Sequence, residues 1–179
     1  MLTRLIAILL LSVVGPAQSG SAPLSKPATA DPWAGWEFLL GEWVLGDGGG
    51  KPGQATTANA SFTLDLQGQL IVRKNHSEYA SVDEKPPVIH DDLMTVYKEG
   101  GVTRAIYWDT EGHTIHYTAR LSEDGKKIVF LSDPTAGPRF RLTYENLKRG
   151  TMKVGFEVAP PDKPGQFAMY VEGTMVRKR

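Results

Sequence analysis

The chain has 179 residues, equal numbers of basic and acidic side chains (20 each), and no cysteine. Zero net charge removes the electrostatic attraction that drives most nucleic-acid binding, so no nucleic-acid partner is expected. The missing cysteines exclude disulfides, thiol nucleophiles and zinc–cysteine sites. The length and the ordinary hydrophobic content of 41% fit a single globular domain.

The first 22 residues are typical of an export signal. Arg4 precedes an apolar run over residues 5–14, and small residues follow. That run is shorter than the about 20 apolar residues of a membrane-spanning helix. We therefore expect a signal at 1–22, a flexible leader at 23–32 and one domain at 33–179. The mature protein would be periplasmic or extracellular, with no membrane span.

A short aromatic helix is expected to open the domain. Asp31 suits the N-cap of a helix, and Pro32 suits its first helical position. Tryptophan, phenylalanine and leucine dominate residues 33–40, and Gly41 is a suitable stop.

The rest of the chain shows ten short runs typical of strands, separated by turns rich in glycine, proline and aspartate. The runs are Glu42–Leu45, Thr56–Leu66, Gln69–Tyr79, Asp91–Glu99, Val102–Asp109, His113–Leu121, Lys126–Ser132, Arg139–Asn146, Met152–Ala159 and Phe167–Arg177. Such short connections require antiparallel neighbours, and closing the sheet removes its exposed edges. The sequence predicts an all-β protein, an antiparallel up-and-down β-barrel of about ten strands with a short N-terminal helix. A β-sandwich is the alternative.

The segment Trp36-Glu-Phe-Leu-Leu-Gly-Glu-Trp43 resembles the entry to lipocalin-like barrels. In those folds the tryptophan of a G-x-W motif closes one end of the barrel, and a basic residue near the last strand covers it. The resemblance implies that role for Trp43, with Arg177, Lys178 and Arg179 available as the covering residue.

Four further segments resemble an uncharacterised family of lipocalin-like exported bacterial proteins: residues 91–94, 104–107, 111–118 and 139–145. The resemblance extends over residues 33–177. It implies the barrel fold, and it carries no settled activity. A second resemblance is to the nitrobindins, ten-stranded barrels that bind haem through a histidine, because the run LGDGGG at 45–50 matches part of their glycine-rich segment.

The hairpin around Gly112 predicts which side chains share a face. A three-residue loop with this glycine in the left-handed conformation pairs Asp109 with His113. Tyr107, Ile115 and Tyr117 then lie on the same face. The same rule applied to the next hairpin adds Leu131 to that face. We expect this face to line the interior, although a register shift of one residue would reverse it.

Asp109 beside His113 would form a carboxylate–imidazole pair, suited to general-base chemistry or to gripping the polar end of a ligand. A salt bridge that caps the hairpin is the alternative. Arg73 and Asn75 belong to a polar face of their strand, where they could hold a carboxylate or could meet solvent.

No metal site is expected, because no ligand set has a recognised spacing. His113 and His116 are three residues apart, so on a strand they face opposite sides. The run His90, Asp91 and Asp92 is expected only to flank the start of a strand.

Together these features predict an exported barrel that binds a small, largely apolar ligand in its cavity without a cofactor. The missing catalytic motifs favour binding over catalysis. The expected ligand-binding residues are Arg73, Asn75, Tyr107, Asp109, His113, Ile115, Tyr117 and Leu131. The alternatives are an enzyme that uses the pair Asp109 and His113, and a haem-binding protein that uses His113 or His116.

Overall fold

The computed structural model describes residues 31–46, 55–80, 86–148 and 150–179. The expected export signal and most of the expected leader lie outside these ranges. Among the described residues, no helix has the length and apolarity needed to cross a membrane.

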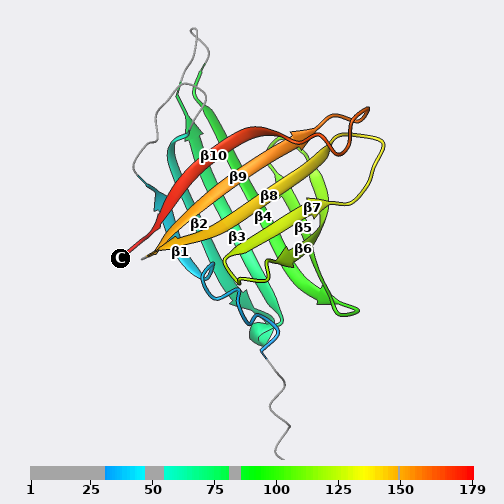
Figure 1. Ribbon diagram of the computed structural model, residues 1–179. Helices are drawn as coiled ribbons and strands as arrows, with labels where there is room; N and C mark the ends of the chain where they lie inside the picture. Colours follow the sequence, from blue (N-terminus) through cyan, green and yellow to red (C-terminus); the bar gives the residue numbers. More distant parts are fainter. Residues whose placement is uncertain (1–30, 47–54, 81–85, 149) are drawn as a thin grey trace, which may run out of the picture.

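Ten antiparallel strands close into a single barrel in the order β1-β10-β9-β8-β7-β6-β5-β4-β3-β2 (Figure 1). Each strand therefore pairs with its sequence neighbours, and the first pairs with the last. The strands are β1 (Gly41–Leu45), β2 (Ala55–Asp65), β3 (Leu70–Tyr79), β4 (Val88–Glu99), β5 (Val102–Asp109), β6 (Thr114–Leu121), β7 (Lys127–Ser132), β8 (Arg139–Lys148), β9 (Thr151–Ala159) and β10 (Ala168–Arg177). A single turn, η1 (Leu66–Gly68), joins β2 to β3. The predicted all-β up-and-down barrel is confirmed.

One end of the barrel, called here the closed end, is plugged by the aromatic residues that precede β1. Residues 32–39 form two successive turns, in which Trp36 N donates to Trp33 O at 2.8 Å and Leu39 N donates to Trp36 O at 3.0 Å. Trp33 Nε1 donates to Gly68 O at 2.8 Å, and Trp43 Nε1 donates to Leu39 O at 2.7 Å. These bonds pair two of the buried indole N–H groups, those of Trp33 and Trp43.

Arg177, at the end of β10, covers this plug. Its guanidinium lies 4.5 Å from the centre of the Trp43 ring, and it donates to the carbonyls of Leu40 and Phe38. Gly41 has a φ of 117°, and a Cβ added there would meet the same guanidinium. The G-x-W arrangement is thus present in space, with Arg177 as the basic residue.

The core continues inward from the plug as a chain of edge-to-face aromatic contacts. The ring centroids of Trp36 and Phe130 are 5.8 Å apart, those of Phe130 and Tyr144 are 6.0 Å apart, and those of Phe62 and Tyr144 are 5.3 Å apart. Aliphatic side chains fill the space between the rings, including Leu39, Ile71, Met94, Val96, Ile128 and Met152.

The first predicted hairpin register is confirmed. Gly112 has a φ of 87°, and Asp109 N donates to His113 O. Tyr107 is opposite Ile115, as expected.

The second predicted hairpin register is wrong by one residue. Ser122 N donates to Lys127 O, so the loop is one residue longer than expected. Ile128, Phe130 and Ser132 face the core instead of Val129 and Leu131. Leu131 points outward, and 37% of it is exposed.

Candidate functional site

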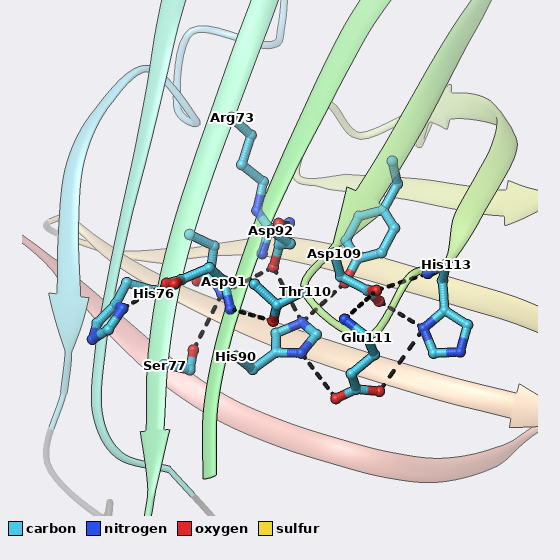
Figure 2. Close-up of polar contacts among 12 residues, drawn as sticks. Arg73, His76, Ser77, His90, Asp91, Asp92, Asp109, Thr110, Glu111 and His113 are labelled. Carbon is cyan, nitrogen blue, oxygen red and sulfur yellow. Dashed lines mark hydrogen bonds and ion pairs between the residues drawn. The ribbon is translucent and has the colours of Figure 1, made fainter.

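The other end of the barrel, called here the open end, carries polar side chains on the inner faces of β3, β4 and β5 and on the β5–β6 hairpin. We define them as the polar cluster: Arg73, Asn75, Ser77, His90, Asp92, Tyr107, Asp109, Glu111 and His113. Figure 2 shows most of them pointing toward one another across adjacent strands. Strand alternation explains the grouping, because Arg73, Asn75 and Ser77 are each two residues apart.

The deepest part of the polar cluster is a buried ion pair between Arg73 and Asp92. Asn75 Nδ2 also donates to Asp92 Oδ2 at 3.0 Å, so both carboxylate oxygens are bonded. Burial alone would lower the pKa of Arg73, but the Asp92 carboxylate and the neighbouring tyrosines together outweigh it and raise the pKa above its usual range. Arg73 therefore stays protonated inside the barrel.

Buried tyrosines surround this ion pair. The Arg73 guanidinium lies 5.9 Å from the centre of the Tyr144 ring, and the rings of Tyr107 and Tyr117 are 6.4 Å apart. Burial raises the pKa of Tyr144 to about 12. The hydroxyls of Tyr117 and Tyr144 and the Nε of Arg73 are buried, and none of these atoms has a hydrogen-bond partner among the described residues. Because buried polar groups are normally paired, these three atoms are exceptional.

His90 lies next to the ion pair, and each of its two ring nitrogens contacts another side chain. Its Nδ1 is 3.2 Å from Glu111 Oε1, and its Nε2 is 3.0 Å from the Tyr107 hydroxyl. Asp92 Oδ2 is 3.6 Å from the same Nε2. Hydrogen bonding to Asp92 first, and then to Glu111, raises the pKa of His90 despite partial burial.

Asp109 and His113 make the predicted contact, with 2.8 Å between Asp109 Oδ2 and His113 Nδ1. Asp109 also accepts hydrogen bonds from the backbone N–H groups of Glu111 and His113, at 3.0 and 2.9 Å. Burial raises the pKa of Asp109, but these bonds outweigh it and hold the pKa below its usual range. The Asp109 side chain is 4% exposed and that of His113 is 52% exposed, so the pair caps the hairpin at the rim.

Apolar side chains lie on the opposite wall of the open end. Phe140 on β8 and Phe156 on β9 stack with their ring centroids 5.8 Å apart and an interplanar angle of 12°. Tyr170 on β10 meets Phe156 edge-on at 6.2 Å. The open end is therefore polar on one wall and aromatic on the other.

A depression of about 400 Å³ lies on the outer surface of β3, β4 and β5, where Lys74, Leu93 and Trp108 are cross-strand neighbours. It is lined by Lys74, Asn75, Asp91, Asp92, Leu93, Trp108, Asp109 and Thr110.

Most of the expected ligand-binding residues do point into the barrel. Arg73, Tyr107, Ile115 and Tyr117 are buried there, Asn75 is half-buried against Asp92, and Asp109 and His113 lie at the rim. Leu131 is the exception, because the longer second hairpin turns it outward.

The sequence interpretation missed His90, Asp92 and Glu111. It is correct that neighbours such as Asp91 and Asp92 face opposite sides. His90 and Asp92, however, are two residues apart and share the inner face. That spacing was the available signal. No comparable signal points to Glu111, which joins the cluster only because the hairpin loop folds back toward His90.

No protein-family model and no curated protein matches the chain. The closed ten-stranded antiparallel barrel is consistent with a calycin-like fold.

Proposed function

We propose that the protein is an exported lipocalin-like barrel that binds a small amphipathic molecule at its open end. The polar group of the ligand contacts the buried tyrosines and Arg73, and its apolar part lies against Phe140 and Phe156. Small barrels can hold one such molecule, fixed by a few polar groups among apolar ones.

The observation that carries the proposal is the set of unpaired buried atoms around the ion pair: the hydroxyls of Tyr117 and Tyr144, and Arg73 Nε. A buried polar group without a partner costs about 1–3 kcal/mol, and a ligand that pairs with it recovers much of that cost. Asp92 already neutralises Arg73, so a neutral hydrogen-bonding group suits this position better than a second anion.

The aromatic wall accounts for the apolar part of the ligand. Phe140, Phe156 and Tyr170 form a continuous series of ring contacts at the open end. Tyr170 is 74% exposed, so its ring is accessible to a ligand that lies against this wall.

Native mass spectrometry of the protein purified from the cells that make it tests the proposal directly. We expect a bound small molecule, displaced on titration with the fluorescent probe anilinonaphthalene sulfonate. Recovery of bare polypeptide together with no saturable probe binding would reject the proposal.

Two variants and one control locate the binding. Tyr144→Phe removes only the hydroxyl, and we expect affinity for the native ligand to fall about threefold to tenfold. Phe156→Ala should weaken probe binding by about tenfold or more. Leu131→Ala, on the outer surface, is the matched control and should change neither affinity. Equal losses in all three variants would contradict binding at the open end.

Export is the second part of the proposal, and the composition of residues 1–22 supports it. Expression in a bacterial host followed by fractionation and mass measurement is the test. We expect a mature form that lacks about 19–22 residues outside the cytoplasm. Accumulation of the uncleaved chain in the cytoplasm would contradict export.

A further inference from the structure

We propose that the rim of the open end carries a divalent metal site whose ligands are His90, Asp109 and Glu111. One ligand atom from each of these three side chains lies within 4.8 Å of the other two. The set combines one imidazole nitrogen with two carboxylate oxygens, which suits Zn²⁺ and related transition-metal ions better than Ca²⁺ or Mg²⁺. The site is separate from the proposed ligand contacts around Tyr117 and Tyr144.

The spacing is close to what a metal requires. Ligands about 2.1 Å from a shared ion are about 3.4 Å apart in a tetrahedral site. His90 Nδ1 and Glu111 Oε1 are already 3.2 Å apart. Asp109 is held in place by the two backbone N–H groups of its own hairpin, so only small side-chain rotations are needed to close the site.

The surroundings of His90 are those of a metal-binding imidazole. A ligating histidine usually donates its other ring N–H to a carboxylate or a similar acceptor, which fixes the ring and its tautomer. In His90 that other nitrogen, Nε2, faces the Tyr107 hydroxyl at 3.0 Å and Asp92 Oδ2 at 3.6 Å. Asp92 is in turn fixed by Arg73 and Asn75 (Figure 2). The imidazole is therefore oriented by groups that are not themselves ligands.

Charge gives an independent reason to expect a cation. Asp92, Asp109 and Glu111 bring three carboxylates to the inside and rim of the open end, and Arg73 is the guanidinium that faces them. The carboxylates therefore outnumber the guanidinium by two, and a divalent ion would balance that excess. Like charges held together in a partly buried site are costly unless a cation joins them.

His113 lies beside this three-ligand set without belonging to it. Its Nδ1 is 2.8 Å from Asp109 Oδ2 and 3.8 Å from Glu111 Oε2, so it contacts two of the ligands from the rim. One imidazole and two carboxylates make an open three-ligand set for Zn²⁺, in which water takes the fourth position.

Titration of the full chain, free of any polyhistidine tag and stripped with a chelator, tests the site. We expect saturable one-to-one binding of Zn²⁺ by calorimetry, and visible d–d bands of a low-coordinate site when Co²⁺ is used instead. His90→Ala and Glu111→Gln should each weaken Zn²⁺ binding by about tenfold or more. Tyr107→Phe, which removes one support of His90, should weaken it by less.

The matched control is His76→Ala. His76 lies on the outer face with Asp91 2.6 Å and Glu78 3.3 Å from its ring nitrogens, an exposed imidazole between two carboxylates outside the proposed set. This variant should bind Zn²⁺ like the wild type. Glu111 lies in an exposed loop, so Glu111→Gln should keep its circular dichroism spectrum and remain interpretable if His90→Ala unfolds. The absence of saturable binding, or binding that survives Glu111→Gln or is lost in His76→Ala, overturns the proposal.

Discussion

The two ends of the barrel differ in what they bury. The closed end buries indole rings and aliphatic side chains, and the N–H groups of Trp33 and Trp43 each have a carbonyl partner. The open end contains an ion pair, a hairpin carboxylate and tyrosine hydroxyls that have no hydrogen-bond partner in the described part of the chain. Buried apolar side chains contribute about 1.5–3 kcal/mol each, whereas buried charges contribute little or cost stability. The difference indicates that the closed end supplies most of the stability. The open end can hold polar groups that add little to stability.

The largest expected effect is at the closed end. Trp43→Ala removes a ring that is 2% exposed, its hydrogen bond to Leu39 O and its contact with Arg177. We expect the free energy of unfolding to fall by about 5 kcal/mol, measured by urea denaturation. A loss below about 1 kcal/mol would show that the plug is not the main source of stability.

A smaller effect is expected within the polar cluster. Arg73→Met leaves Asp92 charged and buried without its cation, which should cost about 3 kcal/mol in the same assay. The double variant Arg73→Met/Asp92→Leu replaces both charges with apolar groups and should recover most of that loss. If the double variant is as unstable as the single one, the pair is a structural requirement and the contrast between the two ends fails.

The covering residue of the plug should matter less than the plug itself. Arg177→Ala removes hydrogen bonds to two carbonyls and a contact with the Trp43 ring, and we expect a loss of about 1–2 kcal/mol. Lys178→Ala is the matched control, because the Lys178 side chain forms an exposed ion pair with Glu42 and its removal should change stability by less than about 0.5 kcal/mol. Similar losses in both variants would argue against a specific role for Arg177.

The smallest effect concerns the outer surface of the open end. Hydrogen bonds to Asp91 first, and then to Glu78, raise the pKa of His76 above its ordinary value of 6.5. Because the folded state favours the protonated ring, its contribution to stability is full below pH 6.5 and is lost as the pH rises through the raised pKa. NMR titration of the His76 ring protons measures this pKa.

Asp91→Asn should move the His76 pKa toward 6.5. Glu172→Gln, at a carboxylate that pairs with Lys153, should leave it unchanged. A pKa at or below 6.5 in the wild type would contradict the prediction.

The strands were predictable from the sequence because turn residues separate them, and the first hairpin register followed from Gly112. The predicted register of the second hairpin was wrong, although Gly125 also has a positive φ, of 68°. Here Ser122 pairs with Lys127, and Asp124 accepts from Ser122 Oγ and Lys126 N within the loop. Loop length depends on such contacts, which residue types alone do not specify, and an error of one residue reversed the face of Leu131.

The candidate site was predictable where it depends on alternation along a strand. Counting residues placed Tyr107 and Tyr117 on the inner face. It also put Arg73 and Asn75 on one face of their strand, without deciding whether that face was inner or outer. The contacts of His90 were not predictable in this way, because they join β4 to the β5–β6 hairpin. The local sequence does not show how close two separate segments lie in the fold. Glu111 illustrates this limit, since it approaches His90 from a loop 21 residues further along the chain.

The seam between β1 and β10 couples two events in folding. Three paired residues in the described part of the chain join these strands, and one of the pairs places Trp43 opposite Arg177. The residue that covers the plug is therefore also a residue of the closing seam. A chain still being synthesised cannot close the barrel or cover the plug until residue 177 is available, so both steps wait for the same last segment and should occur as one cooperative transition.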